Sequence, residues 1–209
     1  MEPDFWHARW GEGRIGFHEG QPNAHLVNHL GIYTGKKRVF VPLCGKTEDL
    51  AYLAAQGFEV VGVELVETAV QAFFAEHGLT PVVTKVGPFV RYALGGITLF
   101  AGDFFATTRE LLGPIDALFD RAAVIALPLT MRPDYVEHVR ALMPEGAPGL
   151  VITVEYPQDQ RGGPPFSVPE AELRTHYEGL SVIRVDEVLA EGPALTEVGA
   201  REKAFVVRF

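Results

Sequence analysis

The hydrophobic positions of the chain alternate between short runs rich in β-branched residues and longer segments with helical periodicity. Apolar runs occupy residues 38–43 and 58–65, and amphipathic segments follow them at 47–57 and 67–78. This order predicts βαβ units with parallel strands. The last residue of each amphipathic segment is a glycine, as expected at a left-handed helix cap.

Five further apolar runs predict strands and bring the expected sheet to seven. They lie at residues 97–102, 115–120, 149–156, 180–188 and 203–209. Several of these runs are continuously apolar, which predicts strands buried on both faces. The loop at 190–202 is too short for a helical crossover, so the last strand should be antiparallel to its neighbour.

The predicted fold class is therefore α/β, a doubly wound, mostly parallel, seven-stranded Rossmann-like sheet with an antiparallel last strand. We expect one domain over residues 1–209. Residues 1–37 precede the first strand and should form an N-terminal cover segment, with the core at 38–209.

The charge and composition of the chain exclude several classes of binding partner. The net charge of −9 argues against a nucleic-acid binder, which needs a basic surface to displace counterions. Cys44 is the single cysteine, which excludes an intramolecular disulfide and favours a reducing compartment. The sequence shows no signal peptide and no apolar run of roughly 20 residues. We therefore expect a cytoplasmic monomer with a small polar partner, and no membrane or nucleic acid.

In open α/β sheets, ligands bind beyond the carboxyl ends of the strands. The segment PLCGKTEDL leaves the first strand there, with Leu43 lining the crevice and Gly45 placed for a tight turn or close ligand approach. A purely structural turn is an equal alternative. Cys44 is interpreted as a buried spectator thiol. Glu64 ends the next strand, where a carboxylate could accept both hydroxyls of an adenosine ribose.

Two further strand ends carry candidate residues. Asp103 and Phe104 follow the run at 97–102 and could meet an adenine edge and face. Arg121 directly follows Asp120 after the run at 115–120. It could contact a ligand, or it could form a salt bridge with Asp120 that holds the loop.

Aromatic residues gather before the first strand, in FWHARWGEGRIGFH. Trp6, Trp10, Phe17 and His18 could form a lid over a flat ligand, or an arm packed on the domain surface. The histidines are loosely spaced and no HExxH or CxxC motif accompanies them. We therefore predict no metal site.

The segments FWHARW, GFHEG, RVFVPLCGKTEDLAYLAAQGFEVVGVE, GDFF, FDRAAVIAL and GGPPFSVPEAEL, in this order, resemble the thiopurine S-methyltransferase family of class I methyltransferases. The resemblance spans nearly the whole chain. It implies S-adenosylmethionine as cofactor, S-adenosylhomocysteine as product and no metal. The implied acceptor is a small molecule with a thiol or thione group, and related sequences extend the range to halide, selenium and tellurium compounds.

The resemblance also assigns roles by position. It implies cofactor contacts for Trp6, Trp10, Phe17, Leu43, Gly45, Glu64, Asp103, Phe104 and Arg121. Arg121 is the implied catalytic residue, near the methionine end of the cofactor. Acceptor contacts are implied for Phe17, His18, Phe166 and Val168. The loop at 190–202 lacks the basic and aromatic stretch typical of the family, which leaves the acceptor open.

Two alternatives stay open at this stage. A NAD(P)-dependent oxidoreductase shares the strand, glycine turn, helix and strand-end acid, although GxGxxG is missing here. A nucleoside-binding regulator without turnover would also share these features.

Overall fold

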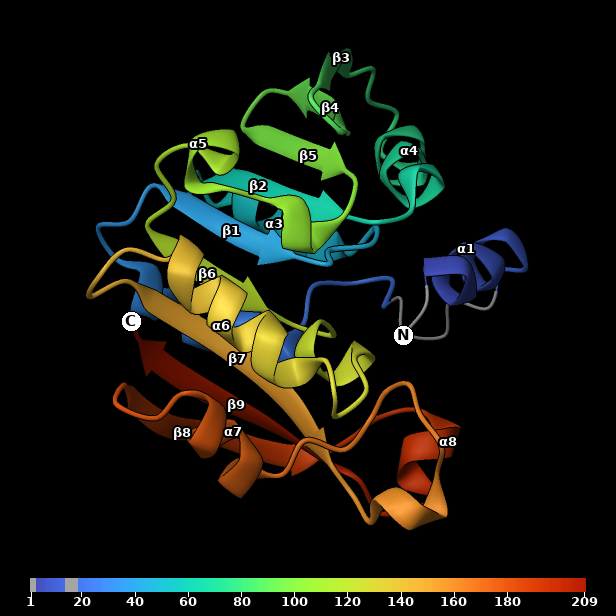
Figure 1. Ribbon diagram of the computed structural model, residues 1–209, viewed down its shortest axis with the longest axis vertical. Helices are drawn as coiled ribbons and strands as arrows, with labels where there is room; N and C mark the ends of the chain where they lie inside the picture. Colours follow the sequence, from blue (N-terminus) through green and yellow to red (C-terminus); the bar gives the residue numbers. More distant parts are fainter. Residues whose placement is uncertain (1–2, 14–18) are drawn as a thin grey trace. The chain divides into compact units, whose positions relative to one another are not determined.

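The computed structural model describes residues 3–13 and 19–209, which group into two compact units, Met1–Ala117 and Leu118–Phe209 (Figure 1). Across these described residues, no helix has the length and apolar character needed to cross a membrane.

The first unit holds five strands and several helices. Its strands are β1 (Arg38–Pro42), β2 (Glu59–Glu64), β3 (Val82–Val86), β4 (Phe89–Leu94) and β5 (Ile97–Ala101). Its helical elements are α1 (Pro3–Gly11), α2 (Ala24–His29), η1 (Leu30–Tyr33), α3 (Glu48–Ala55), α4 (Glu67–Glu76), η2 (Phe104–Ala106) and α5 (Arg109–Leu112). The strand order is β3-β4-β5-β2-β1. The β1–β2 and β2–β5 pairs are parallel, as the βαβ pattern predicts.

Helices α3 and α4 confirm the two predicted amphipathic segments. Thr47 caps α3, because its hydroxyl accepts the backbone N–H of Asp49 at 3.4 Å. Gly57 and Gly78 follow the two helices with φ of 91° and 64°, so both are left-handed as expected. These caps end each helix where the chain must return to the sheet.

A β3–β4 hairpin precedes β5 and was not predicted. Strand β3 pairs antiparallel with β4, which pairs antiparallel with β5. All five residues of β3 are exposed, so the strand carries no buried apolar pattern for sequence reasoning to detect. The two glycines that mark the turns were visible in the sequence, and both Gly87 and Gly95 adopt a left-handed φ of 56°.

The second unit holds four strands with helices between them. Its strands are β6 (Ala117–Asp120), whose first residue ends the first unit, β7 (Pro148–Glu155), β8 (Ser181–Leu189) and β9 (Arg201–Arg208). Its helical elements are η3 (Val124–Ala126), α6 (Arg132–Leu142), η4 (Gln158–Gln160), α7 (Glu170–His176) and α8 (Pro193–Thr196).

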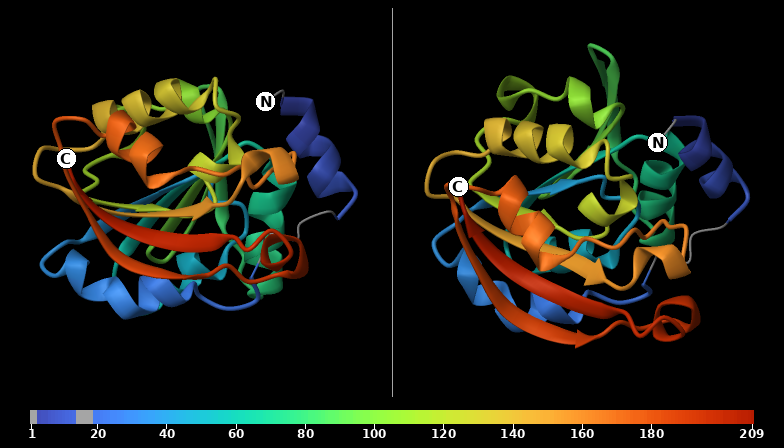
Figure 2. Two further views of the ribbon diagram at one scale, coloured as in Figure 1. Left: turned by 90° about the horizontal axis from the view of Figure 1, so that it is seen from below. Right: turned by 60° about the horizontal axis from the view of Figure 1, so that its bottom comes forward.

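Strand β9 lies between β7 and β8 and is antiparallel to both, which confirms the predicted antiparallel last strand and terminal hairpin. Figure 2 shows β8 and β9 side by side as a long hairpin. Together the two units contain nine strands in the described residues, so the prediction of seven was low by the β3–β4 hairpin.

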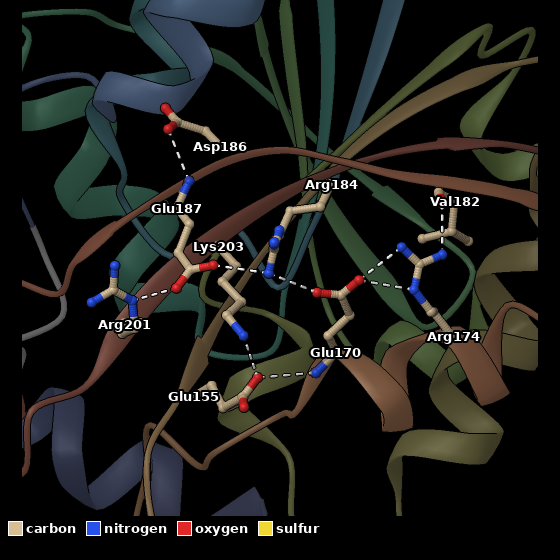
Figure 3. Close-up of polar contacts among 9 residues, drawn as sticks. All are labelled: Glu155, Glu170, Arg174, Val182, Arg184, Asp186, Glu187, Arg201 and Lys203. Atoms are coloured by element: carbon tan, nitrogen blue, oxygen red, sulfur yellow. Dashed lines mark hydrogen bonds and ion pairs between the residues drawn. The ribbon is translucent and has the colours of Figure 1, made fainter.

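A chain of ion pairs joins β7, α7, β8 and β9 (Figure 3). Glu155 pairs with Lys203, Glu170 pairs with both Arg174 and Arg184, and Glu187 pairs with both Arg184 and Arg201. Glu155 ends β7 and accepts from Lys203 Nζ at 2.7 Å and from the Glu170 N–H at 3.1 Å. Burial favours a higher pKa for Glu155, but these hydrogen bonds outweigh it, and the pKa lies below its ordinary value. The chain of ion pairs thus fixes the end of β7 at which the loop 156–166 begins.

Candidate functional site

The turn after β1 adopts a strained backbone. Leu43 has φ of 46° and Gly45 has φ of 53°. Glycine adopts this left-handed region freely, whereas a leucine there costs roughly 1–2 kcal/mol. The Cys44 N–H donates to the Val63 carbonyl at 3.0 Å and ties the turn to β2. Strain of this kind persists where the surrounding structure holds it, commonly at ligand sites.

Glu64 fastens two strand-end turns to each other. Its Oε2 accepts the Gly45 N–H at 2.8 Å, and its Oε1 accepts the Val66 N–H at 2.8 Å. Burial raises the pKa of Glu64, although the backbone hydrogen bonds act against the rise. The side chain is 7% exposed. A carboxylate offers about four lone-pair sites, and the N–H groups of Gly45, Val66 and Leu65 all act on this one, so capacity for a further donor remains.

The thiol of Cys44 packs against β2, and Gly62 makes room for it. A Cβ at Gly62 would lie 2.8 Å from Cys44 Sγ and 2.6 Å from Leu99 Cδ2. Burial, followed by the negative charge of Glu64, raises the Cys44 pKa well above its ordinary value. The thiol is therefore buried and protonated, as expected for a spectator. The requirement for Gly62 was missed, because a strand glycine gives no sign of its neighbour across the turn.

Helix α1 contributes an aromatic ring to the same turn. A Cβ at Gly45 would lie 3.2 Å from Trp10 Cζ2, so the indole covers the glycine directly. Trp6 packs edge-to-face on Phe5, with ring centroids 5.3 Å apart. The structure thus brings Trp10, Gly45 and Glu64 together. Phe17 and His18 lie outside the described residues.

The turn after β5 buries one of two consecutive phenylalanine rings and leaves the other exposed. Asp103 is exposed, and its Oδ1 accepts the Phe105 N–H at 3.0 Å, which caps η2. Phe104 is 2% exposed and stacks on Phe40 in the core, with centroids 6.4 Å apart. Phe105 is 38% exposed. Of these two rings, Phe104 is therefore the one held in the core and Phe105 the one left accessible, a difference that the sequence does not show because the tight η2 turn decides it.

In the second unit, Asp120 anchors the turn that carries Arg121. Asp120 is fully buried; its Oδ2 accepts from the Tyr135 hydroxyl at 2.8 Å and its Oδ1 from the Val124 N–H at 3.3 Å. Burial raises the pKa of Asp120 to about 6 against the opposing effect of these hydrogen bonds. Ala122, next to the half-buried Arg121, is left-handed with φ of 57°. The buried Asp120 carboxylate therefore stabilises the turn in which Ala122 has a strained backbone.

The loop after β7 is fastened to the same region of the second unit. The Phe166 N–H donates to the Ile125 carbonyl, which lies in η3, at 2.7 Å. Phe166 itself is half-buried. Val168 is fully buried, and its N–H donates to the Val154 carbonyl at 2.8 Å. Phe166 is thus partly accessible to a ligand, whereas Val168 supports the loop from the core.

Comparison with known proteins adds to this geometry. The sequence model of the thiopurine S-methyltransferase family matches residues 1–205. The chain belongs to the thiopurine S-methyltransferase family. The thiopurine S-methyltransferase of Pseudomonas aeruginosa (strain UCBPP-PA14) is 52% identical over 182 residues, covering 86% of this chain and 83% of that protein. That of Xanthobacter autotrophicus (strain ATCC BAA-1158 / Py2) is 52% identical over 181 residues, covering 85% and 84%.

Solved structures show the same fold at low identity. One is Burkholderia thailandensis 1,6-didemethyltoxoflavin-N1-methyltransferase with bound 1,6-didemethyltoxoflavin and S-adenosylhomocysteine. It aligns with a TM-score of 0.66 at 16% identity, covering 99% of this chain and 86% of that chain. The family resemblance and the α/β fold class are both confirmed. The chain is an S-adenosylmethionine-dependent S-methyltransferase, and the oxidoreductase and regulator alternatives are not favoured.

The strand-end turns of this S-methyltransferase suit a nucleoside. The Glu64 carboxylate can accept further hydrogen bonds and is slightly exposed. Gly45 has no side chain, so a ligand could approach its backbone next to the Trp10 ring. A ribose brings hydroxyl donors, which suit the acceptor capacity of a carboxylate that backbone N–H groups already orient. These residues therefore fit the adenosine part of the cofactor.

Proposed function

We propose that this enzyme moves the methyl group of S-adenosylmethionine to the sulfur of a small molecule bearing a thiol or thione, thiopurines included. The observation that carries the proposal is the Glu64 carboxylate, fixed by the N–H groups of Gly45 and Val66 at a strand end. The names of the relatives support the acceptor class.

The first unit would hold the cofactor. Glu64 would accept the ribose hydroxyls, Leu43 and Gly45 would contact the cofactor through the turn, and Trp6 and Trp10 would cover it. Asp103, with Phe104 behind it and Phe105 exposed beside it, would face the adenine. Bound S-adenosylmethionine supplies a sulfonium methyl group that a sulfur nucleophile can take by in-line displacement. Such a transfer needs alignment and exclusion of water rather than a metal.

The second unit would serve the acceptor. A thiol or thione of low pKa arrives largely as its anion, so no dedicated base is required. Arg121 would stabilise that anion or orient the methionine end of the cofactor, on a turn that Asp120 holds in place. Phe166 would pack on the acceptor, with Val168 beneath it, and Phe17 and His18 remain proposed contacts from the cover segment.

Turnover tests this proposal directly. The purified enzyme is incubated with S-adenosylmethionine and 6-mercaptopurine, and products are followed by mass spectrometry. We expect S-methylated purine and S-adenosylhomocysteine in equal amounts. Parallel reactions with an aryl thiol, iodide and selenite define the acceptor range. Methylation at nitrogen, or no methylated product with any sulfur acceptor, would contradict the proposal.

A further inference from the structure

Arg132, the first residue of α6, is a buried cation with partners in three other segments. It is 2% exposed. Its Nε donates to the Leu127 carbonyl at 2.9 Å, and its Nη1 donates to the Ser167 carbonyl at 3.0 Å and to Glu172 Oε1 at 2.7 Å. Its guanidinium also lies over the Phe166 ring, 5.8 Å from the centroid. One side chain therefore joins the segment after η3, the loop after β7 and helix α7.

These contacts fix the end of the loop 156–166 that carries Phe166. The Phe166 N–H is bonded to the Ile125 carbonyl at 2.7 Å, and the Ser167 N–H to Gln158 Oε1 at 2.8 Å. The Phe166 ring lies against Gly163, where a Cβ would come within 2.4 Å of it. These two bonds thus hold the N–H groups of Phe166 and Ser167, while Arg132 holds the Ser167 carbonyl and lies over the ring.

We propose that Arg132 is a positioning residue that sets the acceptor-binding geometry through the Phe166 ring and the backbone beside it. The proposal rests on the proposed function, in which Phe166 packs on the acceptor. It adds that acceptor affinity depends on a cation that lies in the core of the second unit and is only 2% exposed.

The chemistry of the site requires arginine in particular. A guanidinium is a planar fork that donates from Nε and Nη1 in fixed directions and stacks on an aromatic face. A lysine ammonium keeps the charge for Glu172, but it is a single point on a flexible stem and cannot place one donor at each carbonyl while a planar cation lies over the Phe166 ring. Arg132→Lys therefore separates loop positioning from simple neutralisation of the half-buried Glu172 carboxylate.

Helix α6 supplies a matched control. Arg140 lies two turns further along the helix, and its Nη1 donates to the carbonyls of His176 and Glu178, both at 3.1 Å. Arg140→Lys thus removes the same kind of contact away from the loop 156–166. The measurements are the acceptor KM and kcat, the calorimetric Kd for S-adenosylhomocysteine, and the thermal unfolding midpoint.

We expect Arg132→Lys to raise the acceptor KM by about tenfold, the loss typical of one charge-assisted hydrogen bond. The Kd for S-adenosylhomocysteine should stay within about twofold of wild type. Arg140→Lys should lower the unfolding midpoint without raising the acceptor KM. Equal KM changes in the two variants, or no change in Arg132→Lys, would overturn the proposal.

Hydrogen exchange gives a readout that does not depend on turnover. In Arg132→Lys the amides of Phe166 and Ser167 should exchange faster than in wild type, while Arg140→Lys leaves them protected. If the wild-type enzyme methylated no sulfur acceptor, the proposed function would fail, yet this exchange result would still decide whether Arg132 positions the loop. If Arg132→Lys does not fold, Glu172→Gln weakens the same cluster and should raise KM in the same direction; an unchanged KM there would count against the proposal.

Discussion

The buried carboxylate of Asp120 makes the stability of this protein depend on pH in a direction opposite to that of most aspartates. Burial raises its pKa from 3.8 to about 6, and because one pKa unit corresponds to about 1.4 kcal/mol, the effect on stability is about 3 kcal/mol. The folded state binds this proton more tightly than the unfolded state does. The contribution is therefore full below pH 3.8 and is lost as pH rises through about 6.

Asp120→Asn removes the titrating group while keeping its size and one acceptor oxygen. Urea unfolding of both proteins between pH 4 and pH 8 gives the free energy of unfolding at each pH. Across that range the wild type should lose about 2.4 kcal/mol more than the variant, because the contribution is not yet full at pH 4. Tyr135→Phe removes a hydrogen bond that lowers the Asp120 pKa, so it should move the loss to higher pH. Asp134→Asn, an exposed carboxylate on α6, controls for net charge. Parallel curves for wild type and Asp120→Asn would refute the reasoning.

Three further predictions concern the ligand site. Glu64→Gln should weaken S-adenosylhomocysteine binding about tenfold or more in calorimetry, because charge-assisted bonds to the ribose are lost; Glu59→Gln, at the other end of β2, should bind normally. Arg121→Ala should lower turnover by about a hundredfold, the loss typical of one transition-state donor, with a wild-type circular dichroism melt; unchanged turnover would discard its role. Gly45→Ala should cost roughly 1–2 kcal/mol in urea unfolding because of its left-handed φ, and should shift intrinsic fluorescence, since Trp10 contacts the glycine and both tryptophans lie in α1.

The sequence predicted those elements whose burial leaves a pattern. Strands β1 and β2 are buried almost throughout, and their continuous apolar runs marked them clearly. Strand β3 is exposed along its whole length and left only turn signals. The antiparallel last strand followed from the length of one loop, because a helical crossover needs more residues than 190–202 provide.

The sequence predicted where the candidate site residues lie along the strands, but it did not predict which of them contact one another. Glu64 and Gly45 could be placed at neighbouring strand ends, but the bond between them depends on the left-handed backbone of Leu43 and Gly45, which sequence does not specify for a leucine. The sequence likewise gave no sign that Phe104 is buried while Phe105 is exposed.

Arg132 lay beyond sequence reasoning altogether. Its partners lie 5, 35 and 40 residues away, and they converge only after α6 and α7 have packed. An arginine at the start of an amphipathic helix is ordinarily exposed, so nothing in the local pattern indicated a buried one.

Calorimetric titration of the purified protein with S-adenosylhomocysteine, with NADH and NADPH as controls, tests the central claim most directly. The account predicts one-to-one binding of S-adenosylhomocysteine and none of either dinucleotide. Absence of S-adenosylhomocysteine binding, or a preference for a dinucleotide, would contradict the assignment of the Glu64 turn to the adenosine of a methyl donor.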